Sequence, residues 1–250
     1  MKLKAISFNI RCIDDEGGYD IEDRAPRMVT VTEKYDADIM GLQEYSRHWE
    51  GEIGKLIGDK YEFFNKYRDD DAPEGTPILW KKDKFDCLKK GYFWFSETPE
   101  VMSGGWDSLG YNRICVYAVL QEKQTGKTFV FMNTHFGFGP ENQVKSVRLM
   151  QEYIEKMSQY PVVVTGDFNM RPNSPAYAEM VKKMQDVNEL TVQDRRTTFH
   201  GYHPEEVTDA HIDYCFINER VKPLSFKIID ETVDGKYPSD HYGLYIELEA

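Results

Sequence analysis

Six segments of the chain place an acidic, amide or imidazole side chain where an apolar strand is expected to begin or end. They read "SFNI", "GLQE", "NTHF", "GDFN", "HIDYCFI" and "SDHYG" in chain order. Oxygen ligands with few carboxylates suit Mg²⁺ or Mn²⁺, which accept phosphate oxygens as further ligands. A free aspartate can position and deprotonate water, while histidines and asparagines donate hydrogen bonds to a phosphoryl group. The set therefore indicates metal-assisted chemistry on a phosphate.

Each of these residues also has a structural interpretation. "GDFN" is typical of a turn, because Gly, Asp and Asn supply turn chemistry. Glu44 is compatible with a helix cap, His135 or His241 with a half-buried histidine, and Asp213 with a stabilising ion pair. The coincidence of six such strand boundaries favours the catalytic interpretation over six separate structural ones.

Other hydrolytic chemistries fit the sequence less well. It contains neither GxSxG nor HExxH, which argues against a serine hydrolase and a zinc protease. His200, His203 and His211 have no common zinc-site spacing, and the loop "TFHGYHPEE" explains them equally well. The four cysteines include no CxxC pair, so free thiols in a reducing cytoplasm are expected, although a disulfide stays open.

Apolar patterning predicts the elements that must position these side chains. Strands are expected at residues 3–10, 37–42, 61–67, 77–81, 91–95, 113–122, 128–135, 162–165, 210–217, 223–229 and 242–248, with a glycine hairpin at "KQTGKT". Helices are expected at residues 24–35, 140–157 and 175–184. Hairpins mixed with strand-helix-strand units predict two packed sheets with helices outside them.

Composition limits the class of protein. The 250 residues are 40% hydrophobic and 14% aromatic, without a linker-like stretch, so residues 1–250 are expected to form a single domain. With 31 basic and 43 acidic residues the net charge is -12, which disfavours strong non-specific DNA binding. No segment is long enough to span a bilayer, and the N-terminus is not typical of a signal peptide. A cytoplasmic protein, monomeric and not bound to a membrane, is therefore expected.

The ordered motifs "SFNIR", "GLQE", "NTHF", "TGDFN", "HIDYCFI" and "SDHYG" resemble the endonuclease/exonuclease/phosphatase superfamily of DNase-like, metal-dependent phosphoesterases. They extend from about residue 6 to residue 243. The flanking "GYFWFSETPE", "GWDS" and "TFHGY" are similar to a generic bacterial subgroup. The resemblance implies an α/β fold, a four-layer α/β sandwich in which two mainly antiparallel sheets pack face to face with outer helices. It also implies Mg²⁺ or Mn²⁺ as the cofactor and in-line attack of water on a phosphorus ester.

The resemblance assigns a role to each matching position. Glu44 would be the principal metal ligand, with Asn9 beside the metal and Asp240 binding it directly or through water. Asp167 would orient or deprotonate the attacking water, and Asn169 would hold that water and the phosphate.

Histidines would act on the phosphate itself. His241 would contact the scissile phosphate, oriented by a hydrogen bond to Asp213. His135 would be a second phosphate donor, and Glu74 matches the acid that pairs with this histidine in DNase-like members.

Two further residues are candidates for substrate binding. Arg113 is expected to bind substrate phosphate or to serve a structural ion pair. Trp106, in the glycine-rich loop "SGGWDSLG", is the aromatic candidate for the pocket.

The motifs do not determine the substrate, because a nucleic acid, a nucleotide or a small phosphodiester is compatible with them. Acidic loops such as "DDEGGYDIED" favour a small phosphoester or a short single strand over a duplex. The alternative is a catalytically silent binding or scaffold member of the same fold. Such a protein should have lost Glu44, Asp167, Asp240 or His241, and all four are present.

Overall fold

The computed structural model describes residues 1–71, 73–107 and 109–250. Its strands form two six-stranded sheets, in the orders β13-β14-β1-β2-β6-β4 and β11-β12-β10-β9-β8-β7, and a short ribbon, β3-β5. The first sheet contains β1 (Lys2–Asn9), β2 (Ile39–Gln43), β4 (Tyr61–Phe64), β6 (Ile78–Lys81), β13 (Lys222–Ile229) and β14 (Gly243–Glu249). The second contains β7 (Phe85–Trp94), β8 (Ile114–Glu122), β9 (Thr128–His135), β10 (Val162–Asp167), β11 (Gln185–Asp186) and β12 (Asp213–Ile217). The ribbon is β3 (Tyr45–Ser46) with β5 (Glu74–Gly75).

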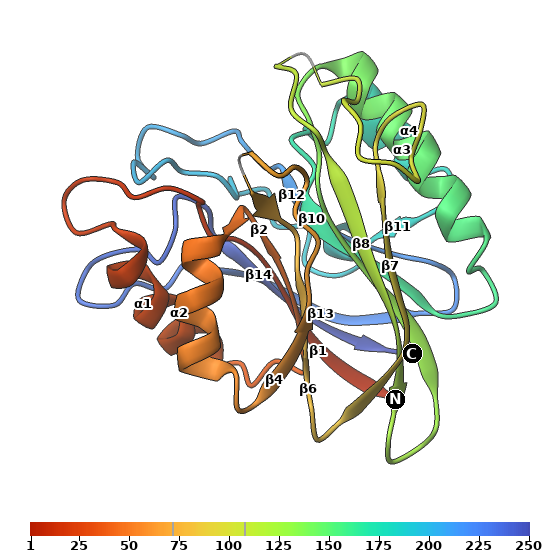
Figure 1. Ribbon diagram of the computed structural model, residues 1–250, viewed down its shortest axis with the longest axis horizontal. Helices are drawn as coiled ribbons and strands as arrows, with labels where there is room; N and C mark the ends of the chain where they lie inside the picture. The colour runs from red at the N-terminus through yellow and green to blue at the C-terminus, as the bar shows by residue number, and fades with distance from the viewer. Residues whose placement is uncertain (72, 108) are drawn as a thin grey trace.

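Helices cover the outer faces of both sheets. Figure 1 shows α1 (Ile21–Glu33) and α2 (Arg47–Ile57) on one side of the molecule, and α3 (Pro140–Glu155) and α4 (Pro175–Met180) on the other. The short α5 (Val187–Leu190) follows β11. One apolar core lies between the sheets, and two further cores lie under α1 and α2 and under α3 and α4. This arrangement confirms the predicted four layers.

Alternate side chains of each central strand enter different cores. In β10, Val162 and Val164 pack toward the helices whereas Val163 packs between the sheets. The same alternation directs Asp167, two positions beyond Thr165, toward the space between the sheets. Polar residues at the strand ends are thus the continuation of the inner face.

Strand direction gathers these ends at one edge of the molecule. β1 and β2 are parallel, as are β9 and β10, so all four strands end at this edge. β12 and β14 are antiparallel to their neighbours β10 and β1, so they begin there. Most other neighbouring strands also pair antiparallel, which confirms the predicted mainly antiparallel sheets.

A buried polar seam joins the two sheets just behind this edge. Gln43 Nε2 donates to Asn133 Oδ1 at 2.7 Å, and Asn133 Nδ2 donates to the carbonyl of Leu42 at 2.6 Å. Gly41 permits the close approach, because a Cβ there would lie 2.6 Å from both Asn133 Oδ1 and Thr165 Oγ1. The sheets are therefore fixed to each other by hydrogen bonds as well as by apolar contact.

Sequence patterning located most elements and missed two helices, α2 and the short α5. α2 contains Gly51 and Gly54, which lower its intrinsic helix propensity. Its stability comes instead from Trp49, Ile53 and Ile57, which are buried at helical spacing, and from the Ser46 cap. Boundaries also differ: β7 begins at Phe85 rather than residue 91, and α1 begins at Ile21, so that Pro26 lies inside the helix.

The four cysteines are free, as predicted. Within the described residues, no helix combines the length and apolar character needed to cross a membrane.

Candidate active site

The predicted side chains meet at the edge where the strands end, and six of them line a cavity there, while Asn9 and Asp213 lie behind it in contact with lining residues. We call them the strand-end cluster: Asn9, Glu44, His135, Asp167, Asn169, Asp213, Asp240 and His241. Pairing between strands sets Asp167 opposite His135 on one side and opposite Asp213 on the other. The cavity has a volume of about 570 Å³ and an open mouth, so the residues that line it are accessible to a ligand.

His241 lies between two aspartates in this cluster. Its Nδ1 is 3.0 Å from Asp213 Oδ2, and its Nε2 is 3.7 Å from Asp167 Oδ2. Burial alone would lower the pKa of His241, but the charge and hydrogen bond of Asp213, with Asp167 and Asp240, raise the pKa to about 10. The imidazole is therefore positively charged at neutral pH and can donate from Nε2.

Asp167 is buried and faces a like charge. Burial and the negative charge of Asp213 raise its pKa to about 7, although His241, the Asn169 N–H and the Asn9 amide favour the ionised form. Asn169 N donates to Oδ1 at 2.9 Å, and Asn9 Nδ2 donates to Oδ2 at 3.0 Å. A carboxylate held in this way can accept a proton near neutral pH.

His135 differs from His241 in its charge. Burial and the nearby Arg113 hold its pKa well below the usual value, so the ring is neutral. Its Nε2 lies 3.1 Å from Asn169 Nδ2, and its Nδ1 lies 3.4 Å from Glu74 Oε1. The predicted pairing with Glu74 is thus present as a close contact. Because the Asn169 amide nitrogen donates, His135 Nε2 accepts, and the proton is placed on Nδ1 facing Glu74.

Glu44 and Asp240 bring further negative charge to the same cavity. Glu44 Oε1 accepts from Asn9 Nδ2 at 3.2 Å and Oε2 from the Cys12 N–H at 3.0 Å. Burial and Glu44 raise the pKa of Asp240 against the opposing effects of His241 and Arg11. For Glu44, burial and Glu74 oppose ionisation, but the Cys12 N–H and the charged His241 favour it, and the pKa is lower than normal.

Asn9 does not fit the predicted ligand role. Its Oδ1 accepts from the Arg11 N–H at 3.1 Å, which directs Nδ2 toward Glu44 and Asp167. An amide nitrogen has no lone pair for a metal ion. Asn9 therefore orients the two carboxylates.

The backbone is strained at three residues that follow strand ends near the cavity. Arg11, Glu44 and Asn169 have φ values of 63°, 58° and 48°, in the left-handed region. Such conformations cost about 1–3 kcal/mol each for residues other than glycine and concentrate at functional sites. The strain is a second indication of function at Glu44, and residue types alone do not show it.

The chemistry of the donor set fits a divalent cation. Glu44 and Asp240 repel each other within one cavity, and a cation bound by both would relieve this repulsion. Asp167, Asp213 and His241 also have ligand atoms within 4.8 Å of one another. However, a protonated His241 lacks a free ring lone pair, so that triad is better described as an ion-paired histidine.

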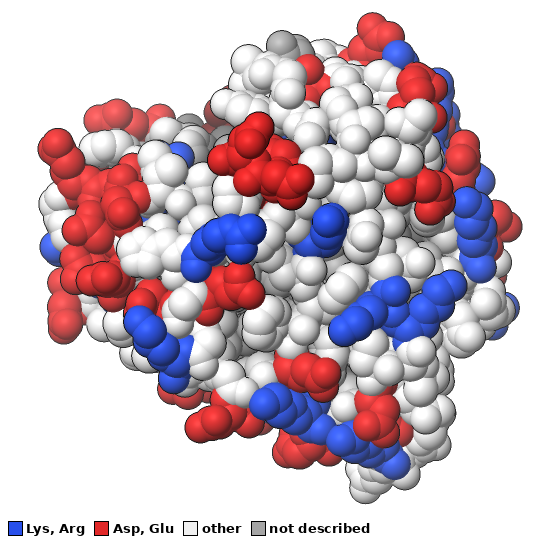
Figure 2. All heavy atoms as spheres, in the orientation of Figure 1, with Lys and Arg blue, Asp and Glu red and all other residues white. Residues whose placement is uncertain are grey.

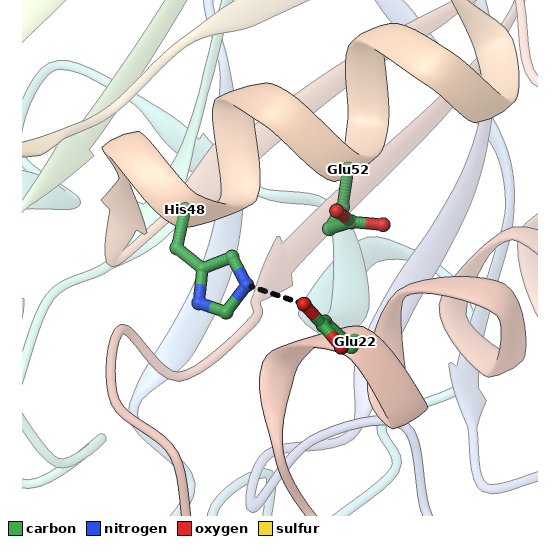
Figure 3. Close-up of side chains that lie close together, drawn as sticks. All are labelled: Glu22, His48 and Glu52. Carbon is green, nitrogen blue, oxygen red and sulfur yellow. Dashed lines mark ion pairs between the residues drawn. The ribbon is translucent and has the colours of Figure 1, made fainter.

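A second group of metal-type side chains lies on the surface. Figure 3 shows His48 and Glu52 of α2 facing Glu22 of α1, with His48 Nε2 3.7 Å from Glu22 Oε1. The His48 and Glu22 side chains are exposed. A solvated ion pair accounts for this geometry.

One substrate-binding candidate reaches the cavity and the other does not. Arg113 lines the cavity, and its Nε donates to the buried Asp107 at 3.1 Å, so the predicted ion pair is present as well. Trp106 is not among the lining side chains in the described parts of the chain. Its Nε1 donates to Glu97 at 2.9 Å, and Lys145 lies over its ring. The next residue, Asp107, points inward instead.

Sequence patterning predicted only Arg113 in another part of the cavity wall. There Arg68, Tyr111, Arg113 and Phe138, which we call the arginine wall, line the cavity together. The guanidinium carbons of Arg68 and Arg113 lie 4.9 Å and 5.5 Å from the centre of the Tyr111 ring. These residues come from loops and strand ends without a local periodic pattern, so only the adjacent "YNR" was available as a signal.

Charge on the surface matches the acidic composition. Figure 2 shows acidic side chains gathered at the side of α1 and α2, with basic and acidic groups interspersed over the rest of this face. This face therefore lacks the continuous positive potential that supports non-specific binding to a duplex.

Comparison with known proteins gives a consistent result. The model of the Endonuclease/Exonuclease/phosphatase family matches residues 6–241. A solved endonuclease/exonuclease/phosphatase from Bacteroides vulgatus is 30% identical, with a TM-score of 0.90 and coverage of 100% of this chain and 99% of that chain. A mannosyl-6-phosphatase of Bacteroides thetaiotaomicron is 28% identical, with a TM-score of 0.90 and coverage of 99% and 100%. These structures confirm the DNase-like α/β sandwich.

Curated relatives are more distant. An uncharacterized protein of Acanthamoeba polyphaga mimivirus is 28% identical over 160 residues, which are 60% of this chain and 60% of the viral protein. The match to a Carbon catabolite repressor protein 4 homolog of Arabidopsis thaliana covers 54% of that protein. The chain thus spans little more than half the length of these relatives.

Proposed function

The chain belongs to the endonuclease/exonuclease/phosphatase family, and from this premise we propose that it is a divalent-metal-dependent hydrolase of phosphoester bonds. The observation that carries the proposal is the pair Asp167 and His241, buried 3.7 Å apart in an accessible cavity. One is an acid whose pKa is raised to about 7, and the other is a histidine whose pKa is raised to about 10. A base and a cationic hydrogen-bond donor are thus available together at neutral pH.

In the proposed reaction, Asp167 acts as the base. A water oxygen bonds to phosphorus while the bond from phosphorus to the ester oxygen breaks, and the water proton passes to Asp167 Oδ2. The ester oxygen leaves with the electron pair of the broken bond and takes up a proton from solvent to give the alcohol, while Asp167 returns its proton to solvent. His241 donates from Nε2 to a non-bridging oxygen and stabilises the charge that develops there. Asp213 holds the imidazolium in place through its 3.0 Å contact with Nδ1.

Glu44 and Asp240 would hold Mg²⁺ or Mn²⁺, which would supply positive charge to the phosphoryl oxygens. Asn9 positions Glu44 and Asp167 through its amide nitrogen. Asn169 supports Asp167 through its backbone N–H and His135 through its side chain. With its proton on Nδ1, His135 is a neutral acceptor in this arrangement, and the Asn169 amide that donates to Nε2 fixes its tautomer.

We also propose that residues 1–250 form one domain, because both sheets contribute to the core between them. The cytoplasmic location and the monomeric state stay predictions from sequence. The scaffold alternative is disfavoured, because a silent member would have no need to keep Asp167 in an environment that opposes its charge.

The test is hydrolysis of bis-(p-nitrophenyl) phosphate and of p-nitrophenyl phosphate, each with Mg²⁺, Mn²⁺ or EDTA. We expect turnover that requires metal and is lost in His241→Ala. The preferred ester distinguishes a diesterase from a phosphatase. Absence of turnover of both esters, together with undetectable Mn²⁺ binding, would favour the scaffold alternative.

A further inference from the structure

The arginine wall shares the cavity with the strand-end cluster but takes no part in the chemistry proposed above. Arg68 and Arg113 keep only 8% and 4% of their surface exposed. One aromatic ring, that of Tyr111, packs against both cations, and Arg113 also lies 5.7 Å from the centre of the Phe138 ring. Stacking of this kind holds a planar guanidinium in a defined orientation.

Acidic side chains bind only part of each guanidinium. Arg68 Nη1 donates to Glu74 Oε1 at 2.8 Å, and Arg113 Nε donates to Asp107 Oδ2 at 3.1 Å. Arg68 Nε and Arg113 Nη1 are buried and have no hydrogen-bond partner within the described residues. Their nearest ion-pair contacts are longer, at 3.8 Å to Asp69 and 3.9 Å to Glu74. Buried donors without an acceptor are unfavourable, so the protein satisfies neither guanidinium completely, and both arginines line the cavity where a ligand can supply further acceptors.

The carboxylate of Glu74 lies between the arginine wall and His135 of the strand-end cluster. Glu74 Oε1, which binds Arg68, also lies 3.4 Å from His135 Nδ1. The other ring nitrogen of His135 lies 3.5 Å from Asp167 Oδ2. The cavity volume of about 570 Å³ is within the range typical of sites for small ligands. One small molecule can therefore contact both sides of the cavity.

We propose that the substrate is a small phosphoester with a second anionic group, a phosphate or a carboxylate, which Arg68 and Arg113 bind. This inference rests on the proposed function, which places the scissile phosphate at the strand-end cluster. Tyr111 and Phe138 are 45% and 41% exposed, so they offer an aromatic surface to the part of the molecule between the two anions.

Calorimetric titration of the Asp167→Asn variant in Mn²⁺ tests the proposal, because this variant should bind substrate with little turnover. Adenosine 5′-monophosphate is compared with adenosine 3′,5′-bisphosphate, and glucose 6-phosphate with glucose 1,6-bisphosphate. The two pairs distinguish a nucleotide from a sugar as the source of the anions. We expect the bisphosphate of at least one pair to bind about tenfold more tightly than its monophosphate, since charge-assisted hydrogen bonds are added.

Adding substitutions to this variant identifies the groups responsible. Arg68→Gln should remove the preference for the bisphosphate and change monophosphate affinity by less than about twofold. Arg113→Lys keeps a cation beside Asp107 and should weaken the preference without unfolding the chain. Arg171→Gln is the matched control, because Arg171 lines the same cavity but is exposed and bound to Asp209. It should leave the preference intact.

The inference is overturned if no bisphosphate is preferred, if none of the four ligands binds, or if Arg68→Gln retains the preference. These results can be distinguished from failure of the proposed function. That function is tested by wild-type hydrolysis of bis-(p-nitrophenyl) phosphate and p-nitrophenyl phosphate, neither of which carries a second anionic group. Hydrolysis of either ester without a bisphosphate preference defeats the inference alone. The opposite result is also possible. If the protein prefers a bisphosphate, loses that preference in Arg68→Gln and hydrolyses neither ester, the proposed function is wrong but the anion site is supported.

Discussion

The two sides of the cavity are built in different ways. The strand-end cluster is carried mainly by the ends and starts of β1, β2, β9, β10, β12 and β14, where register fixes each side chain. The arginine wall comes largely from loops and is held by stacking and ion pairs. The difference suggests that the sheets determine the reaction whereas the loops determine which molecule undergoes it.

The largest effect is expected on the side built by the sheets. Asp167→Asn should lower kcat by about 10²–10⁴-fold, because it removes the proposed base. It should also raise Tm at pH 8. Folding raises the pKa of Asp167 to about 7, so the folded protein is less stable once this carboxyl is ionised at higher pH. Asparagine carries no charge and removes this loss of stability. Steady-state kinetics at saturating Mn²⁺ and a thermal melt measure the two effects, and retention of most metal-dependent activity would contradict the mechanism.

Asp213→Asn should have the next largest effect, about a 10–100-fold loss of kcat/KM. Asp213 is the main group that raises the pKa of His241. Its replacement should therefore move the alkaline limb of the pH profile to lower pH. Wild-type and variant profiles measured in parallel test this, and an unmoved alkaline limb would assign that limb to another group.

The wild-type protein itself should show a bell-shaped profile of kcat/KM. Activity should fall by about tenfold per pH unit as pH drops below the pKa of the base, which is about 7 before a bound cation lowers it. It should fall again as pH rises through about 10, where His241 loses its proton. A profile flat from pH 5 to pH 11 would show that neither group limits the reaction.

On the loop-built side the expected effects are smaller and selective. Asp107→Asn should reduce the preference for a bisphosphate by about 3–10-fold, because it loosens the bond that orients Arg113. Turnover of p-nitrophenyl phosphate should change little. Equal losses on substrates with one and two anions would instead show a general structural role for Asp107.

The smallest effect is expected at the aromatic residue that sequence reasoning favoured. Trp106→Phe should change kcat/KM by less than about twofold, because its indole binds Glu97 rather than lining the cavity. Kinetics on both esters test this. A larger loss of kcat/KM that comes from an increase in KM alone would indicate that Trp106 binds substrate.

This comparison also explains what could be predicted from sequence. Asp167 and Asp213 follow the local period of two of their strands, so their residue types and positions were sufficient. Arg113 was predicted from its place at a strand end. Arg68 was not, because it lies far from Arg113 in the chain and the two meet through Glu74 and Tyr111, an arrangement that no local pattern encodes.

Orientation was equally inaccessible from sequence. The residue type of Asn9 does not show which side-chain atom faces the cluster, because that follows from the left-handed backbone at Arg11, which presents an N–H to the Asn9 oxygen. α2 was missed for a different reason. Its two glycines conceal an apolar face that only the packing against α1 and the first sheet makes stable.

The polar seam between Gln43 and Asn133 has a consequence for plasticity. Sliding of one sheet over the other would break buried hydrogen bonds and the close contact of Gly41 with Asn133 and Thr165. The amides of β2, β9 and β10 should therefore exchange with solvent mainly through global unfolding. Adaptation to different ligands is therefore expected in the loops that carry the arginine wall. Changes of substrate preference there would not disturb the strand-end cluster.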